Sequence, residues 1–238
     1  MEFVHGLHRR LQNGGELEYE EYQRLRALQD RLDDINEILA GRQMPRSESG
    51  PSAPASGPAF AIVVGHTRRA PGADSVAPIG ENEYPWNVDL ANRIHAECQA
   101  RGVESHIFFR DDIGISGAYA QVDDWGASCI AELHFNAFDG SAHGTETLYD
   151  KDTNPESEGW ARALQTAMVE TLGLRDRGVK ERDPGDRGYT SLSASRTPTA
   201  LIEPFFGDNA GDAQIGHDKK PALAAALAET AAARLLGS

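Results

Sequence analysis

The sequence predicts an α/β fold, in which a mostly parallel sheet carries helices on both faces and a helical N-terminal segment precedes it. Two observations lead to this prediction. Short apolar runs, such as residues 60–64, lack alternating polar residues, which is typical of strands buried on both faces. Longer segments with helical spacing of apolar residues separate these runs, and this alternation is typical of a sheet covered by helices.

Each element is predicted from one such segment. Strands are expected at residues 60–64, 105–109, 128–134, 145–149 and 200–203. Helices are expected at residues 84–101, 117–125, 156–172 and 220–236. The stretch from Asp176 to Ser195 is polar and rich in glycine, so it is predicted to be a long loop of the kind that is usually functional.

Composition divides the chain into three parts. Residues 1–43 form a helical N-terminal segment, residues 44–58 a flexible linker rich in proline, serine and glycine, and residues 59–238 the main domain. In the first part, Gly14 and Gly15 precede a helix that is predicted from Glu16 to Ala40.

This N-terminal helix carries an apolar seam with alternating spacings of three and four residues. The seam consists of Leu25, Leu28, Leu32, Ile35 and Leu39. It covers about two heptads, which is short for a coiled coil. We expect residues 16–40 to dock on a second copy or on a larger assembly rather than on the catalytic cleft. Packing of the stripe on the main domain is the open alternative.

The composition also excludes several classes of partner. The formal net charge is −14, from 37 acidic and 23 basic residues, so binding to nucleic acid or to an anionic membrane is not expected. No apolar run approaches the roughly 18 residues of a membrane span. The N-terminus lacks the apolar stretch of a signal peptide, which predicts synthesis in the cytoplasm. Cys98 and Cys129 are expected to be free thiols in the core.

Three predicted strands deliver ionisable side chains at their carboxyl ends. His66 follows the first strand, His134 ends the third and Glu203 ends the last. Chemistry in open α/β sheets gathers at these ends, so the three side chains should lie together. Two histidines and one carboxylate are a common zinc ligand set in hydrolases. From the residues alone, the carboxylate ligand is either Glu81 or Glu83, and Glu203 is the candidate base.

The same residues belong to a series of motifs. These are Val64-Gly65-His66, Glu83-x-x-x-Asn87, His134-x-Asn136, Gly144-Thr145-Glu146 and Ile202-Glu203-x-Phe205. In this order and spacing, the motifs resemble those of the zinc-dependent N-acetylmuramoyl-L-alanine amidases of the amidase-3 family. The resemblance covers about residues 60–238. Members of that family cleave the amide between N-acetylmuramic acid and the L-alanine of the peptidoglycan stem peptide.

The resemblance implies a role for each matched residue. His66, Glu83 and His134 match the zinc ligands of the family. Glu83 is favoured because the family's ligand precedes an asparagine by four residues, as Glu83 precedes Asn87. Glu203 matches the catalytic glutamate, which takes a proton from the activated water and passes it to the leaving amine. The expected cofactor is therefore Zn²⁺, and the expected partner is peptidoglycan.

Several positions depart from the family pattern. Thr67 and Arg68 follow the first histidine where the family usually has two glycines. Glu132 stands where the family has serine, and Pro204 follows the catalytic glutamate where a small residue is usual. These differences indicate a divergent member of the family and leave its fine substrate contacts open.

A few charged residues remain without an assigned role. Arg182 and Arg187, in the long polar loop, are candidates for binding stem-peptide carboxylates, with solvent exposure as the simpler expectation. His143 stands just before the Gly-Thr-Glu motif, where it could touch substrate. Asn209 is a candidate for the asparagine that often follows the family's catalytic glutamate.

The predicted function is a zinc-dependent peptidoglycan amidase. The helical extension and the lack of a signal-peptide stretch favour a phage endolysin, or a wall-cutting part of a tail or injection device. The alternatives are a zinc peptidase or deacetylase on another wall fragment, and a non-catalytic structural or wall-binding component of a phage-like particle. A binding module needs no base, so the presence of Glu203 favours an enzyme.

Overall fold

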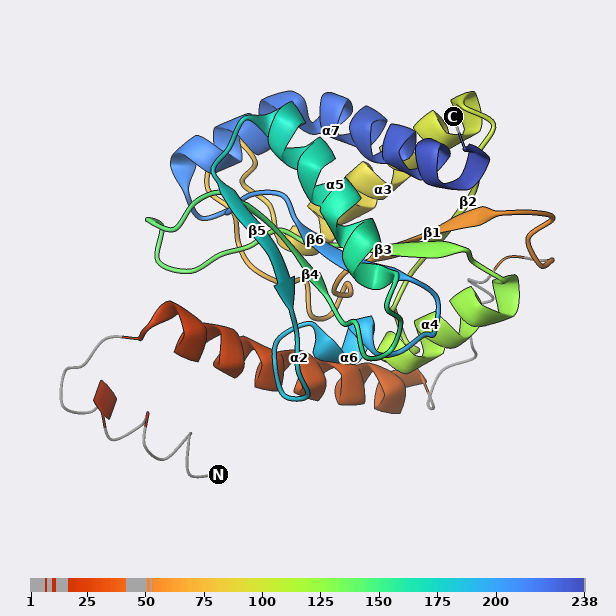
Figure 1. Cartoon of the computed structure of the whole chain (residues 1–238). Coiled ribbons are helices and arrows are strands. Elements are labelled where there is room, and N and C mark those ends of the chain that lie inside the picture. The colour runs from red at the N-terminus through yellow and green to blue at the C-terminus, as the bar shows by residue number, and fades with distance from the viewer. Residues whose placement is uncertain (1–6, 8–9, 12–16, 42–50, 52, 238) are drawn as a thin grey trace.

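The computed structural model describes residues 7, 10–11, 17–41, 51 and 53–237. At its centre is a six-stranded sheet with the strand order β2-β1-β3-β6-β4-β5 (Figure 1). The strands are β1 (Ala59–Val64), β2 (Glu104–Phe108), β3 (Cys129–Leu133), β4 (Thr145–Tyr149), β5 (Asp176–Glu181) and β6 (Thr199–Glu203). β4 pairs antiparallel with β6, and all other pairs are parallel. The predicted fold class is confirmed.

Helices lie on both faces of this sheet (Figure 1). One face is covered by α3 (Glu83–Ala100), α5 (Ser157–Leu172) and α7 (Ala210–Leu236). The other face carries α4 (Gly114–Trp125) and α6 (Tyr189–Leu192), with α2 (Tyr19–Gly41) beside them. The larger apolar core lies on the first face, and smaller clusters lie under α4 and α6.

The alternation of side chains along the strands decides which face each polar residue meets. Leu133 and Ile202 point into the larger core. Their neighbours Glu132 and Glu203 therefore point to the opposite face, which carries α2, α4 and α6. This face, at the carboxyl ends of β3 and β6, is where the candidate site lies.

Most predicted elements are present within a few residues, but two predictions were wrong. The polar stretch from Asp176 to Ser195 is not one long loop, because it contains β5 and α6. As an edge strand whose side chains are mostly half-buried, β5 has no apolar run to reveal it. The last helix begins at Ala210 rather than at residue 220 and continues through Pro221.

Helix α2 matches the predicted N-terminal helix. Its residues Gln23, Ala27 and Glu37 are buried, whereas four seam residues are 42 to 56% exposed: Leu28, Leu32, Ile35 and Leu39. The predicted break at Gly14 and Gly15, and most of the predicted linker, lie outside the described residues. Among the described helices, none combines the length and hydropathy that a membrane crossing requires.

Candidate metal centre

His66, Glu83 and His134 come together at the carboxyl ends of β1 and β3. His66 lies just beyond β1, Glu83 opens α3, and His134 directly follows β3. All three are buried, and one ligand atom from each lies within 4.8 Å of the others. Nε2 of His66 lies 3.1 Å from Oε2 of Glu83, and Nδ1 of His134 lies 2.7 Å from Oε1 of Glu83. The carboxylate therefore lies between the two imidazoles.

The backbone at the end of β1 has an unusual geometry. His66 has a φ of +65°, in the left-handed region that non-glycine residues rarely adopt. Gly65 lies so close to β3 that a Cβ there would come within 2.3 Å of the Leu133 carbonyl oxygen and 2.4 Å of Nε2 of His134. Such strain is typical of functional sites, and here it accompanies the close approach of the two histidine-bearing segments.

The carboxylate of Glu83 is fixed in place and charged. The backbone N–H of Phe135 donates to Oε1 at 3.1 Å, and that of Ala73 donates to Oε2 at 3.1 Å. Burial opposes ionisation, but the adjacent His66 and His134 hold the pKa of Glu83 well below its usual range. An oriented, ionised carboxylate of this kind is suited to bind a cation.

His134 lies between two carboxylates. While Nδ1 faces Glu83, Nε2 lies 2.9 Å from Oε1 of Glu132. Burial acts to lower the pKa of His134, but the hydrogen bonds to Glu132 and Glu83 outweigh it and raise the pKa to about 9. Burial also opposes ionisation of Glu132, yet Arg110 and His134 lower its pKa to about 2. His134 is therefore held on both sides by acceptors.

Glu203, at the end of β6, has the opposite electrostatic character. It is 1% exposed, and Nη1 of Arg187 lies 3.1 Å from its Oε1. Burial raises the pKa of Glu203 to about 7, although Arg187 and His134 act in the opposite direction. Arg187 is 5% exposed, so the expectation that it lies in solvent was wrong. Nothing in its polar, glycine-rich surroundings in the sequence indicated that it would be buried.

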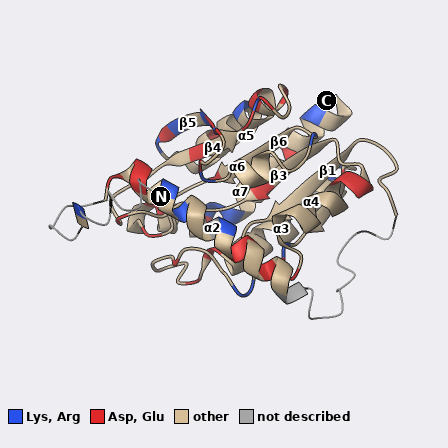
Figure 2. Cartoon of the chain, turned by 90° about the horizontal axis from the view of Figure 1, so that it is seen from below, with Lys and Arg blue, Asp and Glu red and all other residues tan. Residues whose placement is uncertain are grey.

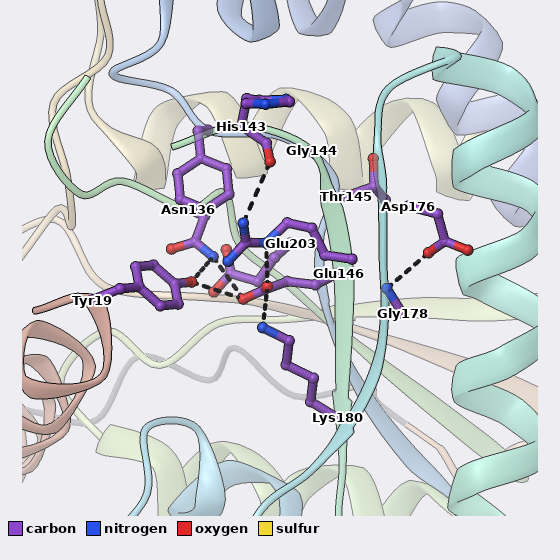
Figure 3. Close-up of polar contacts among 12 residues, drawn as sticks. Tyr19, Asn136, His143, Gly144, Thr145, Glu146, Asp176, Gly178, Lys180 and Glu203 are labelled. Atoms are coloured by element: carbon purple, nitrogen blue, oxygen red, sulfur yellow. Dashed lines mark hydrogen bonds and ion pairs between the residues drawn. The ribbon is translucent and has the colours of Figure 1, made fainter. Parts of the chain in front are cut away.

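A further buried carboxylate, Glu146 of β4, lies next to Asn136 (Figure 3). Nδ2 of Asn136 donates to Oε1 at 2.8 Å, and the hydroxyl of Tyr19 donates to the same oxygen at 3.0 Å. Nζ of Lys180 and Nε of Arg177 donate to Oε2 at 2.8 and 2.6 Å. Burial opposes ionisation, but these two cations lower the pKa of Glu146 to about 2. Glu146 is thus a fixed anion, unlike Glu203.

Helix α2 lies across the face of the sheet that carries α4, as the view from the side of α2 shows (Figure 2). Oε1 of Gln23 accepts a hydrogen bond from Nη1 of Arg187 at 3.1 Å. Further along the helix, Oε1 of Glu37 accepts a hydrogen bond from the Thr67 hydroxyl at 2.8 Å. The expectation that this helix packs away from the cleft was therefore wrong.

Little space remains between α2 and the site. Two cavities of about 20 and 10 Å³ lie there, lined by side chains of both, including Ala27, Glu37, His66 and His134. A single water needs about 10–15 Å³. His66 and His134 are only 6% and 5% exposed, so α2 in this position restricts access to both.

The other candidate residues lie outside this group. Glu81, the alternative carboxylate ligand, is exposed. His143 is also exposed, and its carbonyl oxygen, rather than its ring, accepts a hydrogen bond from Arg177 (Figure 3). Arg182 is half-buried, and Asn209 caps helix α7 by accepting from two backbone N–H groups.

The donor set formed by His66, Glu83 and His134 fits zinc. Two imidazole nitrogens and one carboxylate oxygen are among the usual ligands of catalytic zinc, whose fourth position is left for water or substrate. In the part of the chain that the structure describes, this is the one cluster of histidine, cysteine and acidic residues with suitable spacing. The site can therefore hold one metal ion.

The chain is similar in sequence to known bacterial proteins. The chain is 31% identical over 140 residues to N-acetylmuramoyl-L-alanine amidase LytC of Bacillus subtilis (strain 168), covering 55% of this chain and 26% of LytC. The chain thus spans about a quarter of that relative's length. It is also 28% identical over 165 residues to the uncharacterized protein YqiI of the same strain, covering 67% of this chain and 75% of YqiI.

Solved structures share the fold. The N-acetylmuramoyl-L-alanine amidase from Clostridium difficile 630 superposes with a TM-score of 0.65 at 21% identity, covering 77% of this chain and 100% of the other. AmiC2 of Nostoc punctiforme gives a TM-score of 0.65 at 18% identity, covering 76% and 99%. The family profile described as N-acetylmuramoyl-L-alanine amidase matches residues 61–233, most of the chain. The protein therefore belongs to the amidase-3 family of N-acetylmuramoyl-L-alanine amidases.

Proposed function

We propose that this protein is a zinc-dependent hydrolase that cleaves the amide between N-acetylmuramic acid and L-alanine in peptidoglycan. The observation that carries the proposal is the convergence of His66, Glu83 and His134, with the buried acid Glu203 at the carboxyl end of the neighbouring strand β6. Family membership supports the substrate class. His66, Glu83 and His134 would hold the metal, and Glu203 would be the base.

Three side chains near the metal site would have distinct roles in the reaction. When bound, zinc would activate a water and polarise the scissile carbonyl. Glu203, whose pKa lies at about 7, can take a proton from water at neutral pH and return it to the leaving amine. Arg187 orients the carboxylate of Glu203 through their ion pair. Glu146 remains ionised at neutral pH, so it anchors Asn136 and Lys180 without exchanging protons.

The proposal also assigns roles to the parts of the chain. Residues 59–238 form the catalytic domain, because the candidate ligands and base all lie there. Helix α2 covers the site in the structure, so a peptidoglycan strand can bind only after this helix moves. The exposed seam of Leu28, Leu32, Ile35 and Leu39 is the surface on which a second copy, or a phage-type particle carrying the enzyme to the wall, would dock.

The metal is tested with a His66→Ala/His134→Ala variant. We expect the wild-type chain to bind one zinc ion and this variant to bind none, because one carboxylate alone is a weak zinc site. Zinc content after dialysis, measured by elemental analysis, reports the result, and circular dichroism checks the fold. Equal zinc content in both proteins would refute the assignment of these ligands.

The reaction is tested with Glu203→Gln. This variant should keep its fold and its zinc but lose nearly all hydrolysis, because the amide accepts no proton at neutral pH. Digestion of purified peptidoglycan is followed by the release of L-alanine amino termini. New amino termini at other stem-peptide positions would indicate a peptidase, and free acetate a deacetylase. Either product pattern would replace the amidase assignment.

A further inference from the structure

Glu132 is a buried anion that makes four side-chain hydrogen bonds. Its Oε2 accepts from the Tyr119 hydroxyl at 2.7 Å. Its Oε1 accepts from Nη1 of Arg110 and from the Ser191 hydroxyl, both at 3.0 Å, and faces Nε2 of His134 at 2.9 Å. Glu132 itself has no exposed surface. Three of these partners fix the carboxylate, and the fourth is a candidate metal ligand.

The two nitrogens of His134 face different carboxylates. Nδ1 points to Glu83, the carboxylate that also meets His66, whereas Nε2 points away from them to Glu132. A histidine that binds a metal needs one bare nitrogen and carries its proton on the other. Because Glu132 forms a buried ion pair with Arg110, it is an acceptor, and an acceptor at Nε2 holds the proton there. Nδ1, which faces Glu83 at 2.7 Å, lies where the other two ligands meet, so its proton is the one that a bound metal would replace.

We propose that Glu132 is a positioning residue that orients His134 and fixes its tautomer, so that Nδ1 is presented to the metal. The inference rests on the proposed zinc site. Metal-bound histidines commonly donate their other N–H to a carboxylate, and loss of such a partner typically costs about 10- to 100-fold in metal affinity. The family that the motifs resemble usually has serine at position 132, so the carboxylate partner of His134 is a feature of this chain.

The first test needs no substitution at Glu132. The full-length, zinc-loaded chain is labelled with ¹⁵N-histidine, and the His134 signals are assigned by their loss in a His134→Gln variant. Long-range ¹H–¹⁵N spectra then show which ring nitrogen carries the proton. We expect the proton on Nε2 and the metal on Nδ1. A proton on Nδ1 would overturn the proposal.

The second test compares zinc dissociation constants, measured by competition with a chromophoric chelator. Glu132→Ala should raise the constant about 10- to 100-fold. Glu132→Gln should show a smaller increase, because its amide oxygen still accepts the Nε2–H. The matched control is Glu158→Ala, which removes a carboxylate whose ion-pair partner is Arg162 on the same helix α5, and it should bind zinc as the wild type does. Melting temperatures of the metal-free proteins report any general loss of stability.

The possible results distinguish the role of Glu132 from the existence of the zinc site. Zinc bound equally well by the wild type and a folded Glu132→Ala would overturn the role of Glu132 and leave the zinc site standing. A wild-type chain that takes up no zinc would overturn both. If Glu132→Ala does not fold, the smaller loss in Glu132→Gln and the wild-type tautomer decide the question.

Discussion

Nη1 of Arg187 donates to Oε1 of Gln23 on α2 at 3.1 Å. The same nitrogen of Arg187 forms the ion pair with Glu203. A residue of the covering helix is thus hydrogen-bonded to the partner of the candidate base. Any movement of α2 that admits substrate must break this bond, so the position of the helix and the surroundings of Glu203 change together.

Weakening the contacts of α2 should therefore raise activity. Gln23→Ala in the full-length chain removes the hydrogen bonds from α2 to Arg187 and Asn136. If the state in which α2 covers the site is destabilised by about 1–2 kcal/mol, kcat/KM on soluble wall fragments should rise by up to about 5- to 30-fold. Asn36→Ala, on the exposed side of the same helix, is the matched control and should leave kcat/KM unchanged. Unchanged or lower activity in Gln23→Ala would show that α2 does not limit access.

Glu203 should make the folded protein less stable as the pH rises. Burial raises its pKa from 4.5 to about 7, so the folded state binds this proton more tightly than the unfolded state. The associated stability is present below pH 4.5 and is lost as the pH rises to about 7. Above pH 7, metal-free Glu203→Gln should therefore be more stable than the wild type, by at most about 3 kcal/mol.

Urea unfolding between pH 4 and pH 8 measures this difference. Glu146→Gln is the control, and its effect on stability should have the opposite sign, because the folded-state pKa of Glu146 is lowered to about 2. That variant should be less stable than the wild type at pH 7, and the deficit should shrink as the pH falls below about 4.5. Parallel pH profiles for the wild type and Glu203→Gln would contradict the assigned environment of Glu203.

Zinc binding should release a proton at neutral pH. In the metal-free protein the pKa of His134 is raised to about 9, so at pH 7 its ring carries protons on both nitrogens. The metal must displace one of them, and its affinity should rise about tenfold per pH unit up to about pH 9. Calorimetric titrations in two buffers with different protonation enthalpies count the released protons. No proton release at pH 7 would show that His134 is already neutral or does not bind the metal.

The sequence could predict the fold class and the residues at the strand ends, because both depend on local patterns. β1, β3 and β6 are mostly apolar runs, and His66, His134 and Glu203 stand at or just beyond their last residues. Parallel pairing of these strands in one sheet then brings the side chains to one edge. Glu83 needed the family motif, since Glu81 is two residues away and local pattern does not separate them.

What the sequence could not predict depends on long-range polar contacts. Arg187 lies in a polar, glycine-rich stretch that reads as exposed, and it is buried because Glu203, Asn136 and Gln23 meet it there. The apolar residues of α2 suggested that its leucine-rich face makes the contacts. The face of α2 that contacts the domain instead carries Gln23, Ala27 and Glu37. A contact made by a glutamine and a glutamate leaves no hydrophobic periodicity to detect.

The close packing at Gly65 leads to the last prediction. A Cβ at this position would lie 2.3 Å from the Leu133 carbonyl oxygen and 2.4 Å from Nε2 of His134, so the strand backbone or the ligand must shift. Gly65→Ala should destabilise the fold by about 1–3 kcal/mol and weaken zinc binding. Gly159→Ala in α5 is the matched control, because a Cβ there meets nothing within 4 Å, and it should be neutral or stabilising by up to about 1 kcal/mol. Urea unfolding and zinc competition of both variants provide the comparison, and wild-type zinc affinity in Gly65→Ala would show that the ligands tolerate the shift.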